Sequence, residues 1–101
     1  MRTTNDYKDF VLEQLSGLEK ITCRPMMGEY LLYYDNILFG GIYNNRFLIK
    51  RVEGNKKYNL PEQIPYESAK TMYQIEDIEN RDLVSEIVLE TCKELPKKTK
   101  K

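Results

Sequence analysis

Residues 24–34 read Arg-Pro-Met-Met-Gly-Glu-Tyr-Leu-Leu-Tyr-Tyr, and this stretch decides the fold. Apolar and aromatic residues on both sides of Met27-Gly28 predict two strands joined by a tight turn. Two more two-residue turns follow at Asp35-Asn36 and Asn44-Asn45, whose residue types tolerate positive φ. The predicted antiparallel strands cover residues 21–26, 29–34, 37–43 and 46–51. Pro25 cannot donate to a strand ladder, which predicts that the first strand lies at an edge or ends in a bulge.

Two-residue turns fix the register, so the two faces of the sheet follow by counting along the strands. The face predicted to lie under the helices carries Leu31, Tyr33, Leu38, Ile42, Phe47 and Ile49. The opposite face carries the candidate interface, which comprises Tyr30, Leu32, Tyr34, Phe39, Tyr43 and Leu48. Because this second face is too apolar to stay in water, we expect another protein, a second copy of the chain or residues 52–65 to cover it.

Gly40-Gly41 falls in the middle of a predicted strand, where glycine weakens a sheet. Either a bulky group packs closely above these glycines, or the strand bends there. A pocket beside them is the alternative candidate for a binding site.

Helices are predicted on both sides of the meander. An apolar stripe at helical spacing covers residues 4–17, with Thr3 and Asp6 as a candidate capping box and Gly17 as the C-terminal cap. Asn80 is expected to cap a final helix over residues 81–95. Between them we expect a strand over 72–75 and single helical turns over 55–60 and 66–70. The predicted fold is α+β, with an antiparallel sheet and flanking N- and C-terminal helices in two layers.

The chain has 101 residues and a formal net charge of zero. Four of its lysines lie in residues 97–101, a predicted disordered tail, so the predicted domain over residues 1–96 carries a net charge of −4. Such a body should bind nucleic acid weakly or not at all, because that binding depends on cations that neutralise phosphates. No apolar run approaches the length of a membrane span, and we expect a cytoplasmic protein.

Few residues point to catalysis. The chain has no histidine, which removes the commonest general base and metal ligand, and we expect no cofactor, no metal and no catalytic residue. Cys23 and Cys92 fall in apolar patterns and are interpreted as small core residues. Glu86, Glu90 and Glu94 share one helical face, which is typical of a solvated surface. Arg24 and Glu29 are a candidate structural ion pair across the Met27-Gly28 turn.

Three features of the sequence together resemble the N-terminal domain of the TfoX/Sxy family. They are Arg24-x-Met26-x-Gly28, the Gly40-Gly41 pair in the third predicted strand, and the stretch from Pro65-Tyr66 to Met72. That resemblance implies a fold like that of secretion chaperones and a competence regulator that acts on transcription with a protein partner. The C-terminal domain of the full-length members has no counterpart here, and the resemblance supplies no catalytic residue.

Two functional hypotheses therefore stand. The first is a non-enzymatic regulatory module that binds a protein, either a transcription factor or itself as a homodimer. The second is a small enzyme or small-molecule-binding domain with a pocket near Gly40-Gly41.

Overall fold

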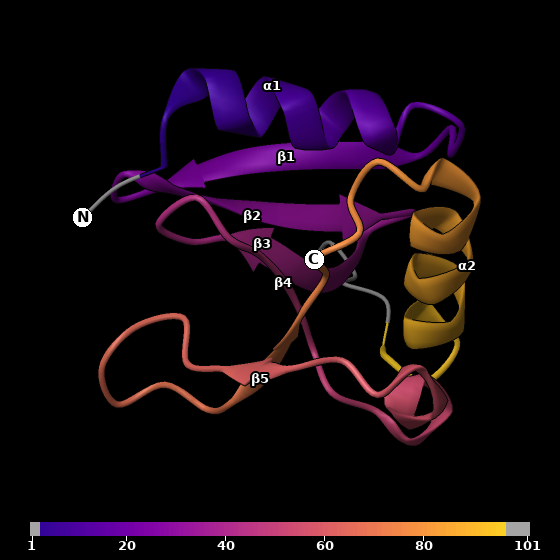
Figure 1. Cartoon of the computed structure of the whole chain (residues 1–101). Helices are drawn as coiled ribbons and strands as arrows, with labels where there is room; N and C mark the ends of the chain where they lie inside the picture. Colours follow the sequence, from indigo (N-terminus) through magenta and orange to yellow (C-terminus); the bar gives the residue numbers. More distant parts are fainter. Residues whose placement is uncertain (1–2, 97–101) are drawn as a thin grey trace.

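The computed structural model describes residues 3–96 and shows the predicted α+β fold (Figure 1). The elements are α1 (Asn5–Gln14), β1 (Ile21–Met26), β2 (Glu29–Tyr34), β3 (Ile37–Ile42), β4 (Phe47–Ile49), the 3₁₀ helix η1 (Glu53–Tyr58), β5 (Glu62–Gln63), β6 (Met72–Gln74) and α2 (Arg81–Cys92). The strands of this region form one antiparallel sheet in the order β1-β2-β3-β4-β6-β5. The predicted tail, residues 97–101, lies outside the described residues.

The three predicted turns are confirmed. Each places two consecutive residues at positive φ: 53° and 88° at Met27-Gly28, 50° and 65° at Asp35-Asn36, and 53° and 57° at Asn44-Asn45. Such pairs match the right-handed twist of the adjoining strands and so set their pairing. β1 lies at the edge of the sheet, which is where Pro25 can be accommodated.

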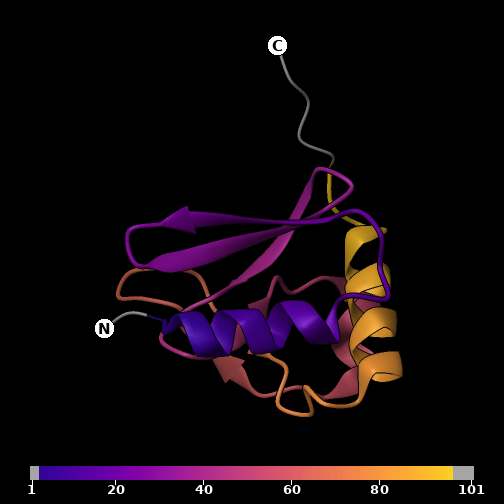
Figure 2. The ribbon, with the colours of Figure 1, turned by 90° about the horizontal axis from the view of Figure 1, so that it is seen from above.

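Both helices begin at a side-chain cap. Thr4, rather than Thr3, caps α1 by accepting a hydrogen bond of 3.2 Å from the Tyr7 amide, and Asn80 caps α2 as predicted. Both helices are shorter than predicted, and Gly17 does not adopt the left-handed conformation expected of a cap. In Figures 1 and 2, α1 lies along the sheet while α2 runs crosswise to it at one end.

A β-bulge changes which side chains face the helices. The β2–β3 register shifts between Leu32 and Tyr33, so that Tyr33 pairs with Leu38 but Leu32 pairs with Gly40. Phe39 is the extra residue, and a bulge of this kind interrupts the alternation of faces. Consequently Tyr30, Leu32, Tyr34 and Phe39 face the helices, whereas Leu31 and Leu38 face away. The faces predicted for these residues were wrong.

The main core lies between the sheet and the two helices. Its fully buried members from the sheet include Leu32, Phe39, Ile42, Phe47 and Ile49. The helices contribute Val11, Leu15, Val84, Ile87 and Val88. Cys92 is buried in this core and Cys23 packs against it, which confirms their interpretation as small core residues; both are free thiols.

The segment between β4 and α2 is less regular than the meander. The predicted helical turn over 55–60 is the 3₁₀ helix η1, which begins two residues earlier. Residues 66–70 form turns instead of a helix, and the two-residue strand β5 was not predicted. Across residues 3–96, no helix is long and apolar enough to cross a membrane.

Candidate functional site

The face of the sheet opposite the helices carries a groove of about 800 Å³. Leu31, Leu38 and Gly40 reach it from β2 and β3, and Met72 reaches it from β6. Tyr43, Leu48 and Met72 form a small second hydrophobic cluster on this side, with Met26 and Leu31 packed against it. The floor of the groove is therefore apolar and is held by the strands themselves.

Three exposed apolar residues line the groove or adjoin its lining residues in the sequence. Met27, at the tip of the β1–β2 turn next to the lining residue Met26, is 95% exposed. Ile64 and Tyr66, in the segment that joins β5 to β6, are 52% and 57% exposed. Both views place this turn and this segment at the end of the molecule away from α2 (Figures 1 and 2). The other large exposed apolar residue of the described chain is Leu89 on α2, at 37%.

Basic side chains also line the groove. The charged lining residues have a summed formal charge of +3. They are four cations and one carboxylate: Lys50, Arg51, Lys56, Lys70 and Glu53. Lys56 Nζ lies 2.9 Å from Glu53 Oε2, Arg51 lies 3.6 Å from Glu62, and Lys50 also has an interaction partner within the chain. Lys70 is exposed and makes no hydrogen bond or ion pair with the residues that the structure describes. The groove is thus a basic region on a domain whose overall charge is acidic.

The Gly40-Gly41 pair is explained by packing. A Cβ at Gly40 would overlap the carbonyl oxygen of Leu48 and lie 2.9 Å from the Ile49 Cα, so strand β3 passes too close to β4 for any side chain. A Cβ at Gly41 would lie 2.5 Å from the Tyr30 carbonyl oxygen and 2.8 Å from the Tyr43 ring. Both alternatives raised by the sequence hold, since the Tyr43 ring packs against Gly41 and a bulge interrupts the strand beside Gly40.

The structure separates the six residues of the candidate interface. Leu32 and Phe39 are 0% exposed in the core under the helices, and Tyr30 and Tyr34 pack against that core. Tyr43 and Leu48 lie on the opposite face, but both are buried there. The groove residues that were not predicted as interface, notably Leu31 and Leu38, could have been found only by recognising the bulge at the glycines.

The candidate Arg24–Glu29 ion pair is wrong. Arg24 is exposed on the edge strand, where its Cα pairs with Leu31. Glu29 Oε1 instead accepts hydrogen bonds from the Thr3 amide at 3.1 Å, the Thr3 hydroxyl at 2.7 Å and the Asn44 amide at 2.9 Å. Glu29 therefore ties the N-terminal segment to the β3–β4 turn. Two backbone amides and one hydroxyl thus satisfy this carboxylate without Arg24.

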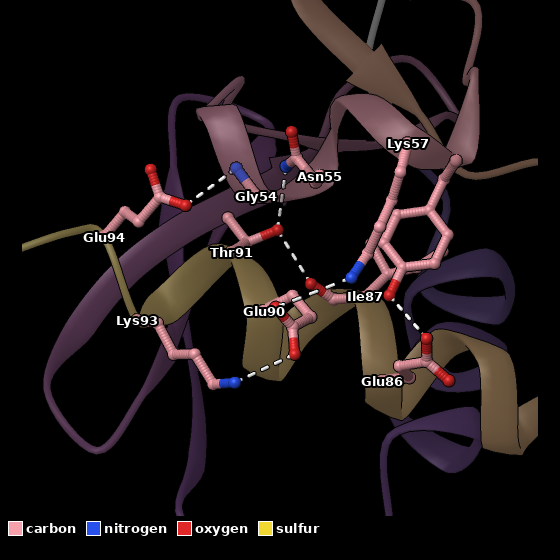
Figure 3. A network of polar contacts seen from close by, with 10 residues as sticks. Gly54, Asn55, Lys57, Glu86, Ile87, Glu90, Thr91, Lys93 and Glu94 are labelled. Carbon is pink, nitrogen blue, oxygen red and sulfur yellow. Dashed lines mark hydrogen bonds and ion pairs between the residues drawn. The ribbon is translucent and has the colours of Figure 1, made fainter.

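The acidic face of α2 is more than a solvated surface (Figure 3). Glu86 accepts a 2.6 Å hydrogen bond from the Tyr58 hydroxyl, and Glu94 accepts one of 2.7 Å from the Gly54 amide. Burial and the Glu86 hydrogen bond raise the pKa of Tyr58. Because Gly54 and Tyr58 belong to η1, the prediction of a merely solvated face was incomplete: these carboxylates dock η1 onto α2.

Asn55 is the buried centre of this docking. Its amide nitrogen donates to the Lys50 carbonyl and to the Thr91 hydroxyl, both at 2.9 Å, and its oxygen accepts from the Val52 amide at 3.1 Å. Thr91 in turn donates to the Ile87 carbonyl at 2.7 Å. Since Lys50, Val52 and η1 form one side of the groove, Asn55 holds that side against α2.

We expect Asn55→Ala to lower the free energy of unfolding by about 3 kcal/mol, because it leaves a buried carbonyl and a buried amide without partners. Chemical denaturation followed by circular dichroism measures the change. Thr91→Val is the graded control: it removes one of the three Asn55 contacts and should cost about 1 kcal/mol. Equal, small losses from both variants would show that Asn55 does not organise this junction.

The described residues offer little for metal or thiol chemistry. No group of three acidic or cysteine side chains in residues 3–96 is arranged to hold a metal ion. Burial raises the pKa of the Cys92 thiol to about 11, and burial likewise raises the pKa of Cys23. Both thiols are therefore protonated at neutral pH and weak as nucleophiles.

The fold and the groove define a small α+β domain whose second sheet face is open and concave. No family model matches the chain. The chain is 30% identical over 80 residues to the uncharacterised 12.7 kDa protein in the trpE 5′ region of Spirochaeta aurantia, an alignment that covers 77% of this chain and 70% of that protein. The chain belongs to the family of that Spirochaeta protein.

Proposed function

We propose that the chain is a non-enzymatic interaction module that binds a segment of another protein in the groove on the helix-free face of the sheet. One observation carries the proposal: of the three most exposed large apolar side chains of residues 3–96, Tyr66 lines this groove, and Met27 and Ile64 directly adjoin its lining residues Met26 and Pro65 in the sequence. Clustered apolar exposure beside a concave surface is typical of protein-binding sites, whereas scattered exposure is not.

Regulation of transcription through a protein partner is part of this proposal and rests on the sequence resemblance to TfoX/Sxy proteins. The net charge of −4 over residues 1–96 supports action through a protein rather than through DNA directly. A cytoplasmic location is also proposed, and the two free thiols fit a reducing compartment.

Binding of a small molecule is the second candidate, and the groove itself favours it. Its volume of about 800 Å³ lies within the usual range for small-molecule sites, and Gly40 lines it as the sequence hypothesis required. The exposed apolar residues beside the groove count against this candidate, because a small ligand within the groove would leave Met27 and Ile64 in water.

We expect a photo-crosslinking amino acid at position 38 to give a discrete adduct in cells of the native organism, while the same amino acid at position 89 gives none. Leu38 lines the groove and Leu89 is an exposed leucine on α2, so the two positions are matched in chemistry and differ in place. An adduct of twice the chain's own mass would identify a second copy as the partner.

Binding of the purified partner is then measured by calorimetry. Leu38→Glu should weaken it at least about tenfold, as expected for a central apolar contact, and Leu89→Glu should leave it unchanged. Identical adducts at both positions, or equal affinity of both variants, would refute the protein-binding groove.

A further inference from the structure

We infer that the segment bound in the groove is acidic as well as apolar: an extended stretch of a partner protein in which one or more carboxylates adjoin apolar side chains. This inference rests on the proposed function and specifies the chemistry of the partner. It follows from the combination of an apolar floor with a basic wall, which occurs in the groove although the domain as a whole is acidic.

Charge sets the groove apart from the rest of the domain. Residues 1–96 carry a net charge of −4, yet the charged side chains that line the groove sum to +3. Even with the Glu62 partner of Arg51 included, the region stays positive. A positive surface on an acidic domain favours acidic partners, because complementary potentials steer association.

The positions of the cations indicate where a carboxylate would lie. Arg51 follows β4 and Lys56 lies in η1, so both belong to the side of the groove that Asn55 holds against α2. Lys70 comes from the segment just before β6, two residues from the apolar lining residue Met72. Arg51 and Lys56 already have carboxylate partners within the domain, whereas Lys70 has no polar partner among residues 3–96. Lys70 is therefore the cation that gains most from a carboxylate on the partner.

The apolar floor lies beside this cation. Leu31 and Leu38 are half-buried and present side chains into the groove from β2 and β3. Tyr66 stands at the rim with its ring centroid 6.0 Å from that of Tyr43, so two aromatic faces border the apolar region. A segment that alternates carboxylates with leucine-like or aromatic side chains satisfies both parts of the groove, while a purely apolar or a basic segment satisfies only one part or neither.

Selection of phage-displayed random dodecapeptides against the whole chain tests this inference while the natural partner is still unidentified. Peptides are retained only if they prefer the wild-type chain to Leu38→Glu, which restricts them to the groove. We expect the retained peptides to be enriched in Asp or Glu beside apolar residues. Their affinity should fall about tenfold in Lys70→Glu, weaken with rising salt, and stay within about twofold in Lys20→Glu. Lys20 is the matched control, an exposed lysine that does not line the groove.

The alternative outcomes are distinct. Apolar peptides without acidic residues, insensitive to Lys70→Glu, would overturn the acidic partner and leave the protein-binding groove intact. If no peptide distinguishes the wild-type chain from Leu38→Glu, the proposed function fails as well. Displacement of the peptides by octanoate at sub-millimolar concentration would overturn the peptide assignment in favour of a small-molecule carboxylate site.

Discussion

Leu32→Asp is expected to unfold the chain as a monomer. Leu32 is 0% exposed in the core between the sheet and the helices, where it packs among apolar and aromatic side chains. The variant loses the burial of a leucine, roughly 1.5–3 kcal/mol, and adds the cost of a buried charge. A total of about 5 kcal/mol approaches the whole stability of a domain of this size. Thermal melting by circular dichroism and sedimentation velocity measure the two parts of this prediction.

Leu31→Asp is the control, one residue away on the opposite face. Leu31 is half-buried and lines the open groove, so a carboxylate there can reach water. We expect this variant to stay folded and to lose groove binding. The comparison also tests the bulge directly, because an unbulged β2–β3 pairing would put Leu31 in the core. A folded Leu32→Asp and an unfolded Leu31→Asp would contradict the register of the β2–β3 pair.

Most of the fold could be predicted because its determinants are local. The turns at Met27-Gly28, Asp35-Asn36 and Asn44-Asn45 depend on two residues each, and the structure places all six at positive φ. The Asn80 cap of α2 is equally local, since its side chain accepts from the Leu83 amide three residues on. Turns and caps of this kind can be predicted from a few neighbouring residues, independently of the rest of the chain.

The faces of the sheet could not be predicted because they depend on a bulge. Counting from the turns placed Tyr33 opposite Leu38 correctly, and the count failed one step later, where Leu32 pairs with Gly40. A shift of one residue exchanges the two faces of a strand. Gly40-Gly41 was the one available signal, since glycine inside a strand often marks a bulge, and a bend of this strand was one of the two predicted alternatives.

The groove could not be predicted because it is assembled from distant segments. Its basic and apolar parts come from β2, β3, η1 and the residues before β6. The residues before β6 are positioned by β5, and a strand of two residues leaves almost no pattern in the sequence. The η1–α2 junction was missed for a similar reason. Glu86 and Glu94 follow the period of an exposed helix face, and nothing local shows that Tyr58 and Gly54 come back to meet them.

Gly40→Ala is expected to destabilise the domain by about 3 kcal/mol, a large effect for one methyl group. The added carbon would meet the backbone of β4, at the Leu48 carbonyl oxygen and the Ile49 Cα, and backbone atoms cannot rotate away as a side chain can. The β3–β4 pairing must therefore open, which weakens bonds such as the one from the Lys50 amide to the Phe39 carbonyl at 2.9 Å. Because β4 joins the meander to β6, the damage extends to both halves of the sheet.

Gly17→Ala is the matched control for the same chemical change. A Cβ at Gly17 meets nothing within 4 Å, and its φ is not positive, so the added methyl group has room. That variant should change the free energy of unfolding by less than about 1 kcal/mol, with stabilisation as the expected sign because alanine restricts the unfolded chain. Urea unfolding of the two variants side by side measures the contrast. A Gly40→Ala protein as stable as Gly17→Ala would mean that β3 and β4 do not approach as closely as the structure shows. The position of Gly40 in the groove would then be wrong as well.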